Sequence, residues 1–139
     1  MFSLGDSAHR ENYMQTLDDI ERLEKIIGQL QAAHSEVAIL AKKSPSDPLN
    51  SFKLKMINKV IQGSNDVLGK KYKPFDDFTQ FEEDDLPSNS DVTMLLAQYM
   101  EETERYRSDN VVRKGSFWFY FFDEEVSNVV SGAPSKVGK

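Results

Sequence analysis

The sequence predicts an all-α fold: a small helical bundle of about four helices with a long N-terminal helical hairpin. Two observations predict it. Apolar residues recur with helical spacing over most of the chain, and short stretches rich in proline, serine and glycine separate the periodic segments. The 139 residues, 39% of them apolar, suffice for one domain with one core. We therefore expect a single helical domain over residues 1–132 and a flexible tail over residues 133–139.

The first helix is expected over residues 7–43. Its apolar positions alternate in steps of three and four, which places them on one face of a helix. They are Tyr13, Thr16, Ile20, Leu23, Ile27, Leu30, His34, Val37 and Ala41. His34 lies within this row, so we expect a buried polar group that fixes the register of the hairpin rather than a catalytic residue. The helix is expected to end before Pro45 and Pro48, which forbid its continuation.

A second helix is expected over residues 48–68, and it completes an antiparallel hairpin over residues 7–69. Asp47 is expected to cap this helix, with Pro48 in its first turn. Gly69 marks its C-terminus and is followed by two lysines, which suit the negative end of the helix dipole. Basic residues on or near the side opposite the apolar stripe are Lys53, Lys55 and Lys59. We expect this basic side to be solvated rather than to bind nucleic acid.

Residues 72–91 form an acidic connector between the hairpin and the next helix. Most of the negative charge lies here and just beyond, because residues 72–112 hold eleven acidic and three basic residues. Aromatic and acidic residues alternate, which is typical of segments that dock into basic-rimmed apolar grooves. The residues concerned are Phe75, Phe78, Phe81, Asp84 and Asp85. The alternative is that the rings pack back onto the hairpin, and both hold if the carboxylates then face a partner.

A third helix is expected to start at Ser88, where Asp91 completes a capping box, and to end near residues 110–114. The segment 115–132 is ambiguous. Its six consecutive aromatic residues favour a strand, whereas a serine before them and a glycine after them fit the ends of a helix. Because no other stretch is recognisable as a pairing strand, we expect a fourth helix, so that the C-terminal helices occupy residues 88–131.

The sequence offers little catalytic or metal-binding chemistry. It has no cysteine, two histidines, and none of the common motifs for hydrolysis, nucleotide binding or zinc binding. The acidic connector also lacks the glycine and glutamate positions of a calcium-binding loop. We therefore expect no catalytic residue, no metal and no cofactor. An enzyme with an unrecognised site is an alternative, with Tyr99, Arg105, Arg107 and Asp109 as its residues.

The function that these features favour is non-enzymatic: a protein–protein interaction or regulatory subunit that uses an acidic and aromatic surface to bind another protein. Trp118 and Tyr120 would anchor this surface together with the connector residues, because these residue types are enriched at binding hot spots. The alternative is that both rings lie in the core. A second possible function is a small acidic inhibitor or decoy, of the phage or immunity type, that occupies a basic nucleic-acid or nucleotide groove. Direct nucleic-acid binding is not expected at a net charge of −6.

The longest uninterrupted apolar run has six residues, so no membrane contact is expected. The first ten residues do not resemble a secretory signal, and we expect a cytoplasmic protein. A homodimer is possible because the first helix is longer than the second, which leaves its first apolar residues without a hairpin partner. Those residues are Tyr13, Met14, Leu17 and Ile20. A second copy, the third helix or the aromatic segment would have to cover them.

Overall fold

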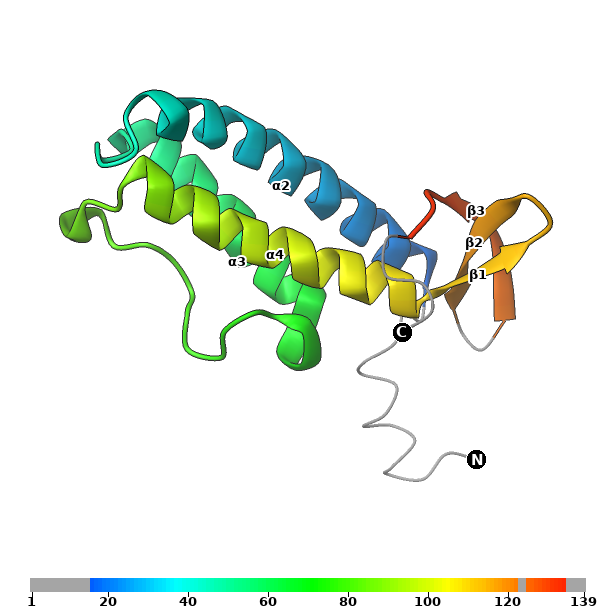
Figure 1. Ribbon diagram of the computed structural model, residues 1–139. Helices are drawn as coiled ribbons and strands as arrows, with labels where there is room; N and C mark the ends of the chain where they lie inside the picture. The colour runs from blue at the N-terminus through cyan, green and yellow to red at the C-terminus, as the bar shows by residue number, and fades with distance from the viewer. Residues whose placement is uncertain (1–15, 123–124, 135–139) are drawn as a thin grey trace.

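The computed structural model describes residues 16–122 and 125–134, and it shows a three-helix bundle with a small antiparallel sheet at one end (Figure 1). The elements are α2 (Leu17–Lys43), α3 (Ser51–Tyr72), the 3-10 turn η1 (Glu83–Asp85), α4 (Asn89–Asp109), β1 (Val111–Lys114), β2 (Phe117–Phe122) and β3 (Glu125–Ser131). The fold is therefore mixed α and β, and the prediction of an all-α bundle of about four helices is wrong. The acidic connector returns the chain along the bundle, so that α3 and α4 run in the same direction and α2 runs against both (Figure 1).

Local capping signals define both ends of α2. The hydroxyl of Thr16 accepts a hydrogen bond from the Asp19 N–H at 3.1 Å, and the Asp19 carboxylate accepts one from the Thr16 N–H at 3.2 Å. The helix ends at Lys43, before Pro45, as the sequence predicts. The predicted continuous helix over residues 7–43 does not form, because Thr16 has an extended backbone and caps α2, which starts at Leu17. Residues 7–15 lie outside the described residues.

The start of α3 differs from the prediction. Asn50, not Asp47, caps the helix, and its side chain accepts a hydrogen bond from the Lys53 N–H at 2.8 Å. The backbone carbonyl of Asp47 instead accepts a hydrogen bond from the Asn89 N–H at 2.8 Å. The loop between α2 and α3 is therefore bonded to the start of α4, which delays the helix by three residues.

The C-terminal end of α3 bends at Gly69, which has φ 66° and ψ −172°. Glycine adopts this backbone conformation at little cost because it has no Cβ. The chain continues beyond the bend to Tyr72, a buried residue whose hydroxyl donates to the Asp109 carboxylate at 2.5 Å. The Tyr72 ring also stacks on Tyr106, with ring centroids 4.7 Å apart. The bend thus brings the end of α3 against the end of α4.

The expected fourth helix is instead part of a three-stranded sheet of order β1-β2-β3. α4 ends at Asp109, and the Asn110 side chain donates to the Tyr106 carbonyl at 2.8 Å. The chain then enters β1, the strand that sequence inspection did not identify. Gly115, with φ 67°, allows the tight turn into β2. With a pairing strand on each side, the aromatic run satisfies its backbone in a sheet, which removes the reason for choosing a helix.

The core lies between the three helices and extends into the sheet. Its buried apolar residues come from all three helices and from β1 and β2. They include Ile20, Leu23, Leu30, Ile61, Leu96, Tyr99, Val111 and Tyr120. Within residues 16–122 and 125–134, none of the helices has both the length and the apolar character that crossing a bilayer requires.

Candidate functional site

The acidic connector runs back along the bundle (Figure 1), and amide side chains of α3 bond its backbone. The Asn58 side chain donates to the Phe81 carbonyl and accepts from the Phe81 N–H, both at 2.9 Å. Seven residues further along the helix, Asn65 donates to the Phe78 carbonyl at 3.3 Å. Residues seven apart lie on the same face of a helix. One face of α3 therefore fixes the backbone of the connector at two points.

The three phenylalanines of the connector are placed differently. Phe78 and Phe81 are half-buried against the core, and their rings meet edge to face at 5.3 Å with an interplanar angle of 73°. Phe75 is 42% exposed. Two of the three rings thus pack on the chain's own helices, which leaves Phe75 as the most exposed ring of the three.

The carboxylates of the connector point to solvent while the rings pack inward. All six acidic residues from position 76 to position 85 are exposed: Asp76, Asp77, Glu82, Glu83, Asp84 and Asp85. Ser51 donates a hydrogen bond to Glu83, which joins η1 to the first turn of α3. Asp84 and Asp85 follow Glu83 within η1. The result is a row of carboxylates on a held backbone.

A groove of about 420 Å³ separates the connector from the first half of α3. Its lining residues include Leu54, Lys55, Asn58 and Lys59 from α3, and Gln80, Phe81, Glu82 and Glu83 from the connector. One wall therefore carries lysines and the other carries carboxylates. The groove can accept a group that bears both charges, or two oppositely charged groups side by side.

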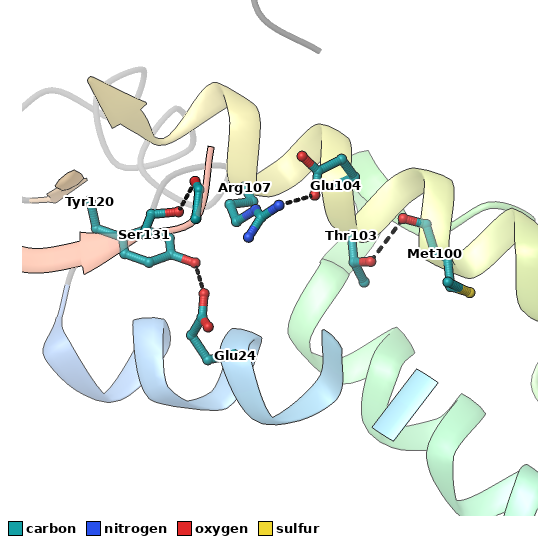
Figure 2. A network of polar contacts seen from close by, with 8 residues as sticks. Glu24, Met100, Thr103, Glu104, Arg107, Tyr120 and Ser131 are labelled. Carbon is teal, nitrogen blue, oxygen red and sulfur yellow. Dashed lines mark hydrogen bonds and ion pairs between the residues drawn. The ribbon is translucent and has the colours of Figure 1, made fainter. Parts of the chain in front are cut away.

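Trp118 and Tyr120 lie on β2, away from the connector's η1 end. Figure 1 shows the sheet at one end of the bundle and η1 at the other. Tyr120 is fully buried, and its hydroxyl donates to the Glu24 carboxylate of α2 (Figure 2). Burial and the neighbouring Glu24 carboxylate raise the pKa of Tyr120 far above its ordinary value of 10. Trp118 is half-buried against the core. The structure thus separates these rings from the η1 end of the connector, where Asp84 and Asp85 lie, and both rings pack against the core where the sheet meets the bundle.

A second groove, of about 360 Å³, lies between α2 and α4. Figure 2 shows Arg107 below the α4 ribbon, where its guanidinium donates to the Glu104 carboxylate at 2.6 Å. His34 lines this groove from α2 and is half-buried rather than fully buried. Apolar side chains such as Ile27 and Met100 complete the lining. The histidine therefore lies beside the bundle core and not within it.

The four residues considered for an enzyme are bound by separate neighbours. Tyr99 is buried and donates to the Asn65 side chain at 2.7 Å, and its burial raises the pKa of its hydroxyl. Arg105 donates to Glu102 at 3.2 Å. Arg107 is paired with Glu104 and Asp109 with Tyr72, as described above. No group of three histidine, aspartate or glutamate side chains that could hold a metal ion occurs among the described residues.

The residues considered for self-association are divided in the same way. Tyr13 and Met14 lie outside the described residues. Leu17 is half exposed, whereas Ile20 is buried within a single chain. Tyr106 of α4 and Ile20 belong to the same buried apolar cluster. The helix α4 therefore helps to cover the apolar positions that the hairpin leaves open.

Sequence inspection missed the two asparagines that hold the connector and the groove with oppositely charged walls. The amide spacing of seven on α3 was visible, but asparagine on a helix is more often solvent-exposed than bonded to a loop. The lysines of the groove were interpreted as a solvated face. Their position opposite Glu82 and Glu83 is visible only in the folded chain.

The function of the chain has to be inferred from its own geometry. No known protein family matches the sequence, and no curated protein or solved structure shows significant similarity to it.

Proposed function

We propose that this protein is a non-enzymatic interaction or regulatory subunit that binds a basic surface of another protein through its acidic connector. The observation that carries the proposal is the arrangement of the connector itself. Its backbone is bonded to Asn58 and Asn65, two of its rings pack inward, and its carboxylates face solvent. A cytoplasmic location is part of the same proposal.

A held backbone favours binding because the segment is already ordered before a partner arrives. Ordering a flexible loop at an interface costs free energy, roughly 0.5–1.5 kcal/mol for each long side chain that is immobilised, and a preorganised surface avoids part of this cost. Residues 72–91 contain seven acidic residues and one basic residue, Lys73. Such a local excess steers a basic partner toward the connector over about a Debye length, roughly 8 Å at physiological ionic strength.

The exposed ring of Phe75 adds an apolar contact at the start of the same segment. Aromatic residues frequently supply the anchor of a protein interface, surrounded by polar contacts that exclude water. The partner surface expected from this chemistry is a shallow apolar depression with lysine or arginine residues at its rim.

Affinity capture from the source cells with matched variants tests the proposal. The connector variant carries Asp84→Asn and Asp85→Asn, and the control variant carries Asp18→Asn and Glu21→Gln. Both variants lose two exposed carboxylates, and the control positions lie on α2. Because the change in net charge is equal, a difference between them reports the position of the charge and not its amount.

A protein that the wild type and the control capture, and that the connector variant does not, supports the proposal. Raising the salt concentration should also weaken the capture, because steering by exposed charges is screened. Equal capture by both variants would contradict the proposal. Displacement of nucleic acid from the captured protein would identify the decoy function as its particular form.

A further inference from the structure

The outer face of α3 carries exposed apolar and basic side chains together. Phe52 is 70% exposed and Met56 is 40% exposed, and these residues are one helical turn apart. Lys55 and Lys59, both exposed, lie on the same side of the helix by their spacing. Exposed phenylalanine and methionine on one stripe are unusual for a solvated helix face, which normally carries polar residues. We call these four residues the basic face of α3.

The basic face of α3 borders the acidic connector. Lys55 and Lys59 line one wall of the 420 Å³ groove, and Glu82 and Glu83 line the other. A neighbouring lysine, Lys53, is paired with Glu36 of α2 at 3.2 Å. Within the part of the chain that the structure describes, no ion pair of 4.0 Å or less engages Lys55 or Lys59. Asp84 and Asp85, also exposed, follow Glu83 in η1. One side of the molecule thus presents a basic strip, Lys55 and Lys59, next to an acidic strip, residues 82–85.

We infer that this side of the molecule binds a second copy of the same chain. A two-fold axis that passes between the two strips would place the basic face of each copy against the acidic connector of the other. Symmetric dimers need a surface that is complementary to itself, and adjacent strips of opposite charge meet this requirement. Each contact is made twice, so that a modest set of charge pairs acts on both sides of the axis. Phe52 and Met56 supply apolar area beside these pairs.

The dimer regulates the proposed function, on which this inference rests because both use the acidic connector. A second copy covers the connector that a basic partner would bind, so the two compete by mass action. At a high concentration of the chain, most connectors are covered by a second copy and cannot bind a partner. A basic partner with higher affinity releases the monomer and takes the connector.

Charge exchange with mutual rescue tests the dimer. The first variant carries Lys55→Glu and Lys59→Glu, and the second carries Asp84→Lys and Asp85→Lys. All four positions are exposed, so the fold should be preserved. Each variant alone should dimerise on the order of 100-fold more weakly than the wild type, because like charges then face each other across the axis. An equal mixture should form a heterodimer, since the exchanged charges are complementary between the two variants.

Sedimentation equilibrium measures all of these states, with one chain at 15.9 kDa and a dimer at twice that mass. Phe52→Ser should also weaken the dimer, and raising the salt concentration should reduce the affinity of the wild type. A wild type that stays monomeric at about 100 μM in low salt would overturn the inference, as would two variants that fail to pair when mixed. The first variant retains an intact connector. Capture of a partner by this variant, together with a monomeric wild type, would therefore refute the dimer and leave the proposed function standing.

Discussion

Replacing Asn58 with alanine should detach the acidic connector from α3. The substitution removes a donor and an acceptor that together bond the backbone of Phe81, at 2.9 Å each. The other amide contact, from Asn65 to the Phe78 carbonyl, is longer, at 3.3 Å, and lies two helical turns further along α3. Asn58 is therefore the principal polar attachment of the middle of the connector.

The expected loss of stability follows from the two hydrogen bonds. A hydrogen bond contributes roughly 0.5–1.5 kcal/mol net, so the pair contributes about 1–3 kcal/mol. Alanine is a better helix former than asparagine by up to about 0.7 kcal/mol, which offsets part of the loss. The free energy of unfolding should thus fall by roughly 0.5–2.5 kcal/mol. At about 4 °C per kcal/mol for a chain of this size, the midpoint of thermal unfolding should fall by roughly 2–10 °C.

Two measurements check this prediction. Urea unfolding gives the change in free energy, and hydrogen exchange reports whether the Phe81 amide loses its protection. The matched control is Gln62→Ala, one turn along the same helix face, where the side chain bonds only the exposed Gln80 side chain at 2.8 Å. The control should change the stability by no more than about 0.5 kcal/mol. If Asn58→Ala matches the control and the Phe81 amide stays protected, the connector is not held in the way we describe.

Two further predictions concern two glycines and the buried Tyr106. Gly28→Ala should stabilise the protein by about 0.5–1 kcal/mol, because it lies inside α2 and its added Cβ meets nothing within 4 Å. Gly69→Ala should destabilise the protein by about 1–3 kcal/mol although the space there is equally open, because a φ of 66° is unfavourable for residues other than glycine. Urea unfolding measures both changes. If the free energy of unfolding changed in the same direction for both variants, this reasoning would be contradicted. Burial, assisted by Asp19 and opposed by Arg22, raises the pKa of Tyr106 from 10.0 to about 12. The stability that the neutral Tyr106 contributes is therefore fully present below pH 10 and is lost as the pH rises through 12. Between about pH 10 and 11.5 the wild type should lose roughly 1–2 kcal/mol more stability than Tyr106→Phe. Parallel pH profiles for the two proteins would exclude this role for Tyr106.

Signals within a few residues of each other were enough to predict several helix ends. The capping box of Ser88 and Asp91 forms as predicted, with the Asp91 N–H donating to the Ser88 hydroxyl at 3.1 Å. The stop of α2 before Pro45 is confirmed as well. The start of α3 was predicted wrongly, because the Asp47 backbone is bonded to the start of α4, 42 residues further along the chain. A contact at that sequence separation leaves no local pattern.

In the candidate site, too, some features were predictable from the local sequence and others depend on distant contacts. Alternation of phenylalanine with carboxylates allowed one arrangement in which the rings pack inward and the charges face outward, and the connector has that arrangement at Phe78 and Phe81. The residues that hold it there were not predictable. Asn58 and Phe81 are 23 residues apart, and a side-chain bond to a loop backbone depends on where the loop passes. Composition indicates what the connector can do, whereas tertiary structure fixes which groups it exposes.

The formation of the sheet depends most clearly on tertiary structure. The composition of residues 117–122 favoured a strand, yet a strand is stable only when neighbours satisfy its backbone hydrogen bonds. Its first neighbour, Val111–Lys114, has only four residues and directly follows a helix, so it could not be distinguished from the end of that helix. Folding pairs Val111 with Tyr120 and buries the Tyr120 ring beside Glu24 of α2. The sequence by itself determined where apolar and charged residues occur and where most helices stop. Whether residues 117–122 form a helix or a strand was determined by the tertiary structure, because the helices supply the core that makes strand pairing favourable.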